Sequence, residues 1–67
     1  DDAGLICNLA LAHCLAGQDA EAERCAAEAA RRDPHDEISA TVLGFVREVA
    51  TGKRSRPKQL SEVFPYA

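Results

Sequence analysis

Residues 5–34, LICNLALAHCLAGQDAEAERCAAEAARRDP, decide the fold of this chain. In the first twelve residues of this stretch, only Asn8 and His13 are polar. Apolar residues recur there at intervals of four, three and four positions, which is the period of one face of an α-helix. The residues of this face are Leu5, Leu9, Ala12 and Ala16. The pattern predicts a first helix over residues 3–16, and since its other faces are also apolar, we expect it to be buried on more than one side.

The rest of the stretch predicts a second, antiparallel helix over residues 20–32. Gly17 suits the left-handed residue that ends a helix. Asp19 is expected to cap the second helix and to place negative charge at its start. One face of this helix carries only small side chains: Ala22, Cys25, Ala26, Ala29 and Ala30. Two pairs of opposite charges have the spacing of ion pairs on a helix surface, namely Glu21 with Arg24 and Glu28 with Arg32.

A third helix is predicted over residues 37–51. Asp33-Pro34 ends the second helix, because proline disfavours a helical residue before it. Asp36 is expected to cap the third helix, whose apolar residues again follow the helical period. They are Ile38, Val42, Phe45, Val46 and Val49. We therefore expect an all-α fold, with a helical domain over residues 1–52 and a basic C-terminal tail or docking arm over residues 53–67.

Composition and charge limit the classes of protein. The chain has 67 residues and a net charge of −3, and its last fifteen residues carry a net +3. No apolar run is long enough to span a membrane. Three cysteines, an odd number, do not describe a secreted disulfide scaffold, so we expect reduced thiols and a cytoplasmic location. A core of this size contributes little stability alone, which indicates support from a partner, a second copy or neighbouring sequence.

The spacing over residues 5–50 resembles the tetratricopeptide repeat (TPR) family, whose pattern is W-x2-L-G-x2-Y, then A-x3-F, then P within 34 residues. The matching positions are Ile6, Leu9, Ala10, His13, Gly17, Ala22, Ala26, Ala29 and Pro34. A shift of 34 residues places Ala40-x2-Leu43-Gly44-x2-Arg47 at the corresponding positions of the third helix. The chain therefore resembles about one and a half repeats. Ala10 and Ala22 would be the points at which the first two helices approach most closely.

The resemblance implies a protein-binding scaffold whose groove is lined by the first helix of each repeat. The groove residues carried over are Cys7, Asn8, Leu11, Cys14 and Leu15. Asn8 stands where many TPR proteins place an Asn that bonds a peptide backbone. Ile38 and Val42 stand where carboxylate-clamping members have Lys or Arg, so we expect an apolar groove.

The residues themselves predict that the first helix buries an apolar face against a protein or peptide partner or a second copy. The large side chains expected on that face are Leu5, Ile6, Leu9, Leu11 and Leu15. We expect a homo-oligomer or part of a longer repeat array, without a membrane partner. Tail residues Leu60, Val63 and Phe64 share one side of a predicted helical turn and offer a surface that docks on the body or on a second subunit.

Two other hypotheses remain open. The first is a small nucleic-acid-binding domain that uses the third helix and the basic residues Lys53, Arg54, Arg56 and Lys58, although no aromatic residue alternates with these charges. The second is a redox or metal sensor that uses Cys7, Cys14 and Cys25. Neither cysteine nor histidine shows metal-ligand spacing, and no feature brings Cys14 to His35. We therefore expect no bound metal, no cofactor and no enzyme activity.

Overall fold

The computed structural model describes residues 3–59, which fold into three helices. They are α1 (Ala3–Leu15), α2 (Asp19–Arg32) and α3 (Glu37–Ala50). The described part of the chain contains no strand, which confirms the predicted all-α class. Each helix end lies within one residue of its predicted position. The interpretation of Leu60, Val63 and Phe64 as a docking turn lies outside the described residues.

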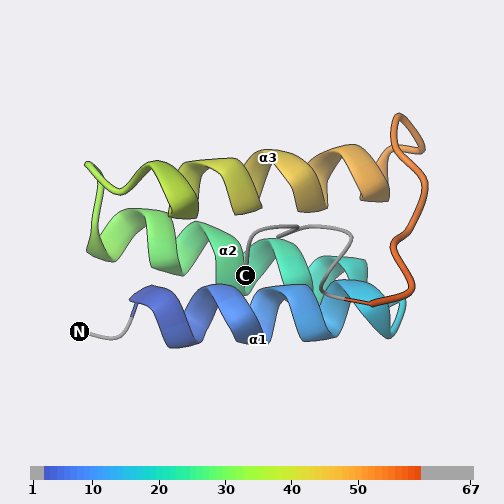
Figure 1. Cartoon of the computed structure of the whole chain (residues 1–67), viewed down its shortest axis with the longest axis horizontal. Coiled ribbons are helices and arrows are strands. Elements are labelled where there is room, and N and C mark those ends of the chain that lie inside the picture. Colours follow the sequence, from blue (N-terminus) through green and yellow to red (C-terminus); the bar gives the residue numbers. More distant parts are fainter. Residues whose placement is uncertain (1–2, 60–67) are drawn as a thin grey trace.

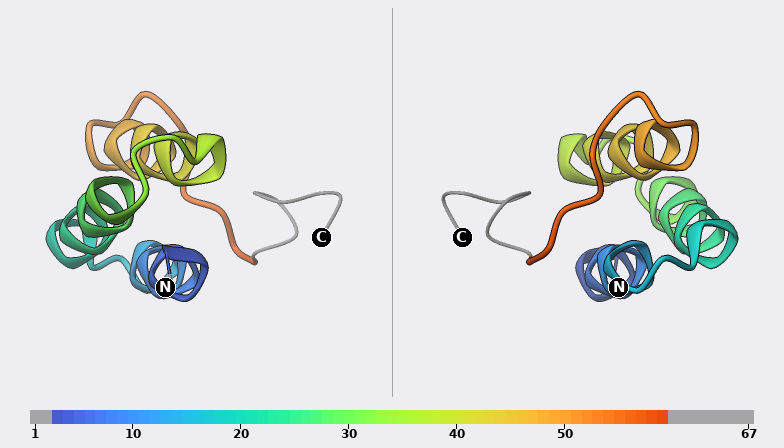
Figure 2. Two further views of the ribbon diagram at one scale, coloured as in Figure 1. Left: turned by 90° about the vertical axis from the view of Figure 1, so that its left-hand side faces the viewer. Right: turned by 90° about the vertical axis from the view of Figure 1, so that its right-hand side faces the viewer.

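The three helices pack side by side, with α1 and α3 running in the same direction and α2 running against both (Figure 1). Seen along the helix axes, α2 lies to one side of the α1–α3 pair (Figure 2). All three helices contact one another. Because α2 packs against two neighbours, its small-residue face decides how closely they approach.

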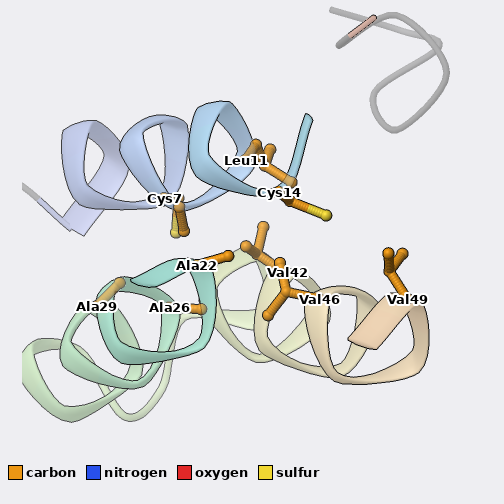
Figure 3. Close-up of a cluster of buried hydrophobic side chains, with 10 residues drawn as sticks. Cys7, Leu11, Cys14, Ala22, Ala26, Ala29, Val42, Val46 and Val49 are labelled. Atoms are coloured by element: carbon orange, nitrogen blue, oxygen red, sulfur yellow. The ribbon is translucent and has the colours of Figure 1, made fainter. Parts of the chain in front are cut away.

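The core is built from small side chains (Figure 3). The α1 residues in it are Cys7, Ala10, Leu11 and Cys14, those of α2 are Ala22, Ala26 and Ala29, and those of α3 are Val42, Val46 and Val49. The alanines of α2 confirm the predicted small face, on which Cys25 and Ala30 are half-buried. Leu11 is the largest fully buried side chain. A core with so little side-chain volume relies on close approach of the helices to exclude water.

The apolar stripe of α3 differs from its prediction at one end. Val42, Val46 and Val49 are buried as expected, but Ile38 is 49% exposed. The fully buried residue of the first turn is Ser39. Ser39 precedes Val42 by three residues, so it continues the same helical face. The expectation for Ile38 was therefore wrong, because the register of this face runs through its polar neighbour.

Both predicted helix signals around Gly17 and Asp36 are confirmed. Gly17 adopts φ +83°, and its N–H donates to the Cys14 carbonyl at 3.1 Å. The Asp36 side chain accepts a hydrogen bond from the backbone N–H of Ile38 at 3.2 Å and caps α3. These two residues end α1 and begin α3 by the expected backbone chemistry.

The predicted capping role of Asp19 is wrong. The N-cap of α2 is Gln18, which makes no side-chain capping bond, while Asp19 is the first helical residue. The carboxylate of Asp19 instead accepts two hydrogen bonds from Arg56. Asp19 and Glu21 still place negative charge in the first turn of α2, as expected.

Candidate interaction surface

The exposed face of α1 carries the predicted stripe of apolar residues. Leu5 is 66% exposed and Leu9 is 51% exposed, and Ala12 and Ala16 next to them are exposed as well. Because a helix turns by 100° per residue, these four side chains point away from the buried Cys14 on the same helix. No Asp, Glu, Lys or Arg lies within α1. The face is therefore apolar and uncharged along its whole length.

The five groove residues carried over from the resemblance do not lie together on the surface. Cys7, Leu11 and Cys14 belong to the core and offer a partner almost no surface. Asn8 is exposed and Leu15 is half-buried. In this conformation only these two residues are accessible, and their role in binding stays a prediction. Leu11 does not lie on the exposed leucine face with which it was grouped.

The other residues of the repeat pattern occupy all burial classes. Ala10, Ala22, Ala26 and Ala29 are fully buried, Ile6 and His13 are half-buried, and Leu9, Gly17 and Pro34 are exposed. Complete burial of Ala10 and Ala22 agrees with a close approach of α1 and α2. Three helices in this order are compatible with many all-α proteins, so the family resemblance stays a prediction.

Hydrogen bonds between the side chains of Cys7, Ser39 and Asp36 join α1 to the start of α3. The Ser39 hydroxyl donates to Asp36 Oδ2 at 2.7 Å, and Ser39 Oγ lies 3.5 Å from Cys7 Sγ. Since a hydroxyl has one proton, and Asp36 accepts it, the Cys7 thiol is the donor to Ser39. The bond to Ser39 is the main reason why the pKa of Asp36 lies below its usual value. Sequence patterns did not reveal these hydrogen bonds, although the spacing of Ser39 from Val42 indicates a buried position for Ser39.

The remaining thiols and histidines do not form a site. Burial raises the pKa of the Cys14 thiol, and nearby Arg56 partly opposes this effect. Cys14 lies near the α1–α2 turn and His35 near the α2–α3 turn, at opposite ends of the bundle (Figure 1). Within residues 3–59, no group of three or more His, Cys, Asp or Glu side chains is placed to hold a metal ion.

The side chains of two arginines in the basic segment are bonded to the helices. Arg54 Nε donates to Glu48 at 2.8 Å, and its guanidinium lies 5.3 Å from the centre of the Phe45 ring. Arg56 bonds Asp19 and the Cys14 carbonyl. The charges of these two arginines are therefore partly compensated within the chain.

Ion pairs also stabilise the helical surface. Glu21 bonds Arg24 and Glu28 bonds Arg32, as predicted, and Glu23 of α2 bonds Arg47 of α3 at 2.8 Å.

In the described part of the chain, no helix has the length and apolar character needed to cross a membrane. No family model matches this sequence, and no curated protein and no solved structure matches it.

Proposed function

We propose that this chain is a protein–protein interaction module that buries the exposed face of α1 against a second copy of itself. One observation carries the proposal: Leu5 and Leu9 lie 66% and 51% exposed on an uncharged helix. Leu11 is the one leucine that is fully buried among the described residues. Two large apolar side chains of α1 are therefore left mostly in water, and their burial against a partner favours association.

The order of residues along the exposed face supports a second copy as the occupant. Its two large residues, Leu5 and Leu9, lie in the first half of α1. Its two small ones follow, with Ala12 in the last turn of the helix and Ala16 just beyond its end. In an antiparallel pair of α1 helices, Leu9 of one copy lies opposite Ala12 of the other. Leu5 lies opposite Ala16 in the same way. Large side chains then pack on small ones, and the absence of Asp, Glu, Lys and Arg from α1 avoids like-charge repulsion in such a two-fold contact.

The dimer is expected to be weak. Burial of these four side chains removes on the order of 300 Å² per copy, well below the ~800 Å² per partner of a standard interface. Association also costs translational and rotational freedom. We therefore expect a dissociation constant of about 0.1–1 mM.

Sedimentation equilibrium in the presence of reductant tests the proposal, over about a hundred-fold concentration range that reaches ~1 mM. We expect the wild type to dimerise with concentration and Leu9→Asp to remain monomeric. Ile38→Asp is the matched control, since Ile38 is another exposed aliphatic residue, on α3. We expect this control to dimerise like the wild type.

Two outcomes contradict the proposal. A wild type that stays monomeric excludes the second copy and leaves a foreign helix or a further repeat as the occupant of the face. Loss of the dimer in Ile38→Asp, with dimerisation kept in Leu9→Asp, places the interface on α3 instead. Circular dichroism of each variant establishes that the helices remain folded.

The proposal includes a scaffold role of the TPR kind, in the cytoplasm and without catalysis or cofactor. The buried positions of the Cys7 and Cys14 thiols support a role without catalysis, because these thiols pack in the core as small side chains.

A further inference from the structure

The chain that follows α3 crosses from the end of that helix to the α1–α2 turn (Figures 1 and 2). We call residues 51–57 the strap. In the first half of the strap, the backbone N–H groups of Lys53 and Arg54 donate hydrogen bonds to the Glu48 carbonyl, at 2.9 and 3.3 Å. These bonds hold its first half to α3.

The second half of the strap is held by Arg56. Arg56 Nη1 donates to the Cys14 carbonyl at 2.8 Å and to Asp19 Oδ1 at 2.7 Å. Arg56 Nη2 donates to Asp19 Oδ2 at 3.1 Å. Among the described residues, Arg56 makes all the hydrogen bonds that join the strap to α1 and α2.

The position of Arg56 is favourable for both helices. Its positive charge lies at the C-terminal end of α1, where the carbonyl groups carry partial negative charge. Asp19 lies at the N-terminal end of α2, where a carboxylate is favoured. Arg56 thus bridges two helix ends that adjoin one short turn, and a two-pronged guanidinium–carboxylate contact fixes its geometry.

The strap lies at one end of the core, where the α1–α2 turn and the end of α3 are found (Figures 1 and 2). Pro57 is buried, although the residues on either side of it are exposed. Cys14 is fully buried and Val49 is 6% exposed. The sulfur of Cys14 points away from Ala22, toward the end of the core where Val49 lies (Figure 3). The Arg56 guanidinium lies close enough to this thiol to influence its pKa.

We propose that the strap opens and closes over this end of the core while the three helices stay folded, with the Arg56–Asp19 contact as its clasp. The strap contains no helix or strand, and both clasp side chains are partly exposed to water. Segments with few buried contacts open locally at a lower free energy than the whole fold. An open strap uncovers Cys14 and Val49 and leaves Cys7, which is bonded to Ser39, covered.

The proposed opening of the strap is tested by the rates at which N-ethylmaleimide modifies Cys14 and Cys7. Tandem mass spectrometry of the digested protein separates the two positions. We compare the wild type with Arg56→Gln, which keeps a polar side chain but is shorter and loses the charge. Arg54→Gln is the matched control, because Arg54 lies on the same strap and bonds Glu48 of α3.

We expect Arg56→Gln to raise the modification rate of Cys14 about three- to tenfold, a range that allows for solvent screening of the clasp. The rate at Cys7 is expected to stay unchanged in this variant, and both rates are expected to stay unchanged in Arg54→Gln. Asp19→Asn removes the other half of the clasp and is expected to act like Arg56→Gln.

Three results would overturn the proposal. An unchanged Cys14 rate in both clasp variants shows that Arg56 does not control access to this end of the core. An equal rise at Cys7 and Cys14 shows that the clasp variants destabilise the whole fold instead of opening the strap. An effect of Arg54→Gln as large as that of Arg56→Gln assigns the protection to the total charge of the strap.

Discussion

Ser39 connects three parts of the molecule through one hydroxyl group. It is fully buried in the first turn of α3, bonds the capping residue Asp36 and accepts from the Cys7 thiol of α1. A buried hydroxyl costs free energy unless its hydrogen bonds are made. Both of its bonds run to groups that also position a helix, so packing of α1 and capping of α3 depend on the same atom.

Replacing Ser39 with Ala tests this connection. We expect a loss of about 1 kcal/mol in the free energy of unfolding, because the variant loses a buried hydrogen bond. We also expect the pKa of Asp36 to rise toward its ordinary value, since the Ser39 bond is the main cause of its depression. Urea unfolding and an NMR titration of Asp36 measure the two effects.

Thr41→Ala is the control, because it removes an exposed hydroxyl from the same helix. It is expected to leave the Asp36 titration unchanged. If Ser39→Ala leaves the Asp36 titration unchanged as well, the bond between the two residues does not form in solution.

At the level of elements, the α1–α2 turn depends on one backbone conformation. Gly17 has φ +83°, a conformation that costs an L-residue roughly 1–2 kcal/mol. A Cβ atom built on Gly17 has no heavy atom within 4 Å, so the effect of a substitution there is conformational and not steric.

Gly17→Ala is therefore expected to lower the free energy of unfolding by about 1 kcal/mol. Gly44→Ala is its counterpart: Gly44 lies in the interior of α3, and its added Cβ also meets open space. We expect this variant to be more stable by about 0.5–1 kcal/mol, because alanine favours the helix. Thermal unfolding measures both changes. Equal shifts in the two variants would contradict the left-handed turn.

The elements show which features local sequence determines. Helix bounds, the Gly17 turn, the Asp36 cap and the small face of α2 all follow from periodicity and backbone chemistry within a few residues. The predicted cap by Asp19 is wrong because the Asp19 carboxylate instead accepts hydrogen bonds from Arg56, which is 37 residues away in the sequence. No local pattern contains such a contact.

The candidate surface could be predicted only in part, because local sequence does not determine which side of α1 packs against the other helices. Periodicity identified Leu5 and Leu9 as one face of α1, and the structure leaves that face exposed. It did not distinguish this face from the one that carries Leu11, since α1 is apolar on nearly all sides. Only the positions of α2 and α3 decide which side becomes the core.

The whole molecule combines a small core with a surface of ion pairs. Among the described residues, three carboxyl groups have lowered pKa values. Hydrogen bonds from Arg31 and then Arg32 lower the pKa of Glu28 from 4.5 to about 2. The Arg56 bond lowers that of Asp19 from 3.8, and the Ser39 bond lowers that of Asp36 from the same value. In each case the carboxyl group binds its proton less tightly in the folded state than in the unfolded state.

These shifts predict an acid-labile fold. The unfolded state binds more protons between the two pKa values of each group, so stability decreases as the pH falls. The contribution is complete above pH 4.5 and is lost as the pH falls toward 2. Urea unfolding at several pH values measures the decrease, which is expected to be smaller at about 1 M salt because the pairs are exposed. Greater stability at pH 3 than at pH 6 would contradict this account.

The most direct measurement of the central claim is an isotope-filtered NOE experiment on an equal mixture of labelled and unlabelled protein at about 1 mM. It detects contacts between copies and no others. We predict cross-peaks from Leu9 of one copy to Ala12 of the other, and from Leu5 to Ala16. Cross-peaks from Leu5 to Leu5 would show a parallel pair, and a complete lack of cross-peaks from α1 would show that its exposed face does not bind a second copy.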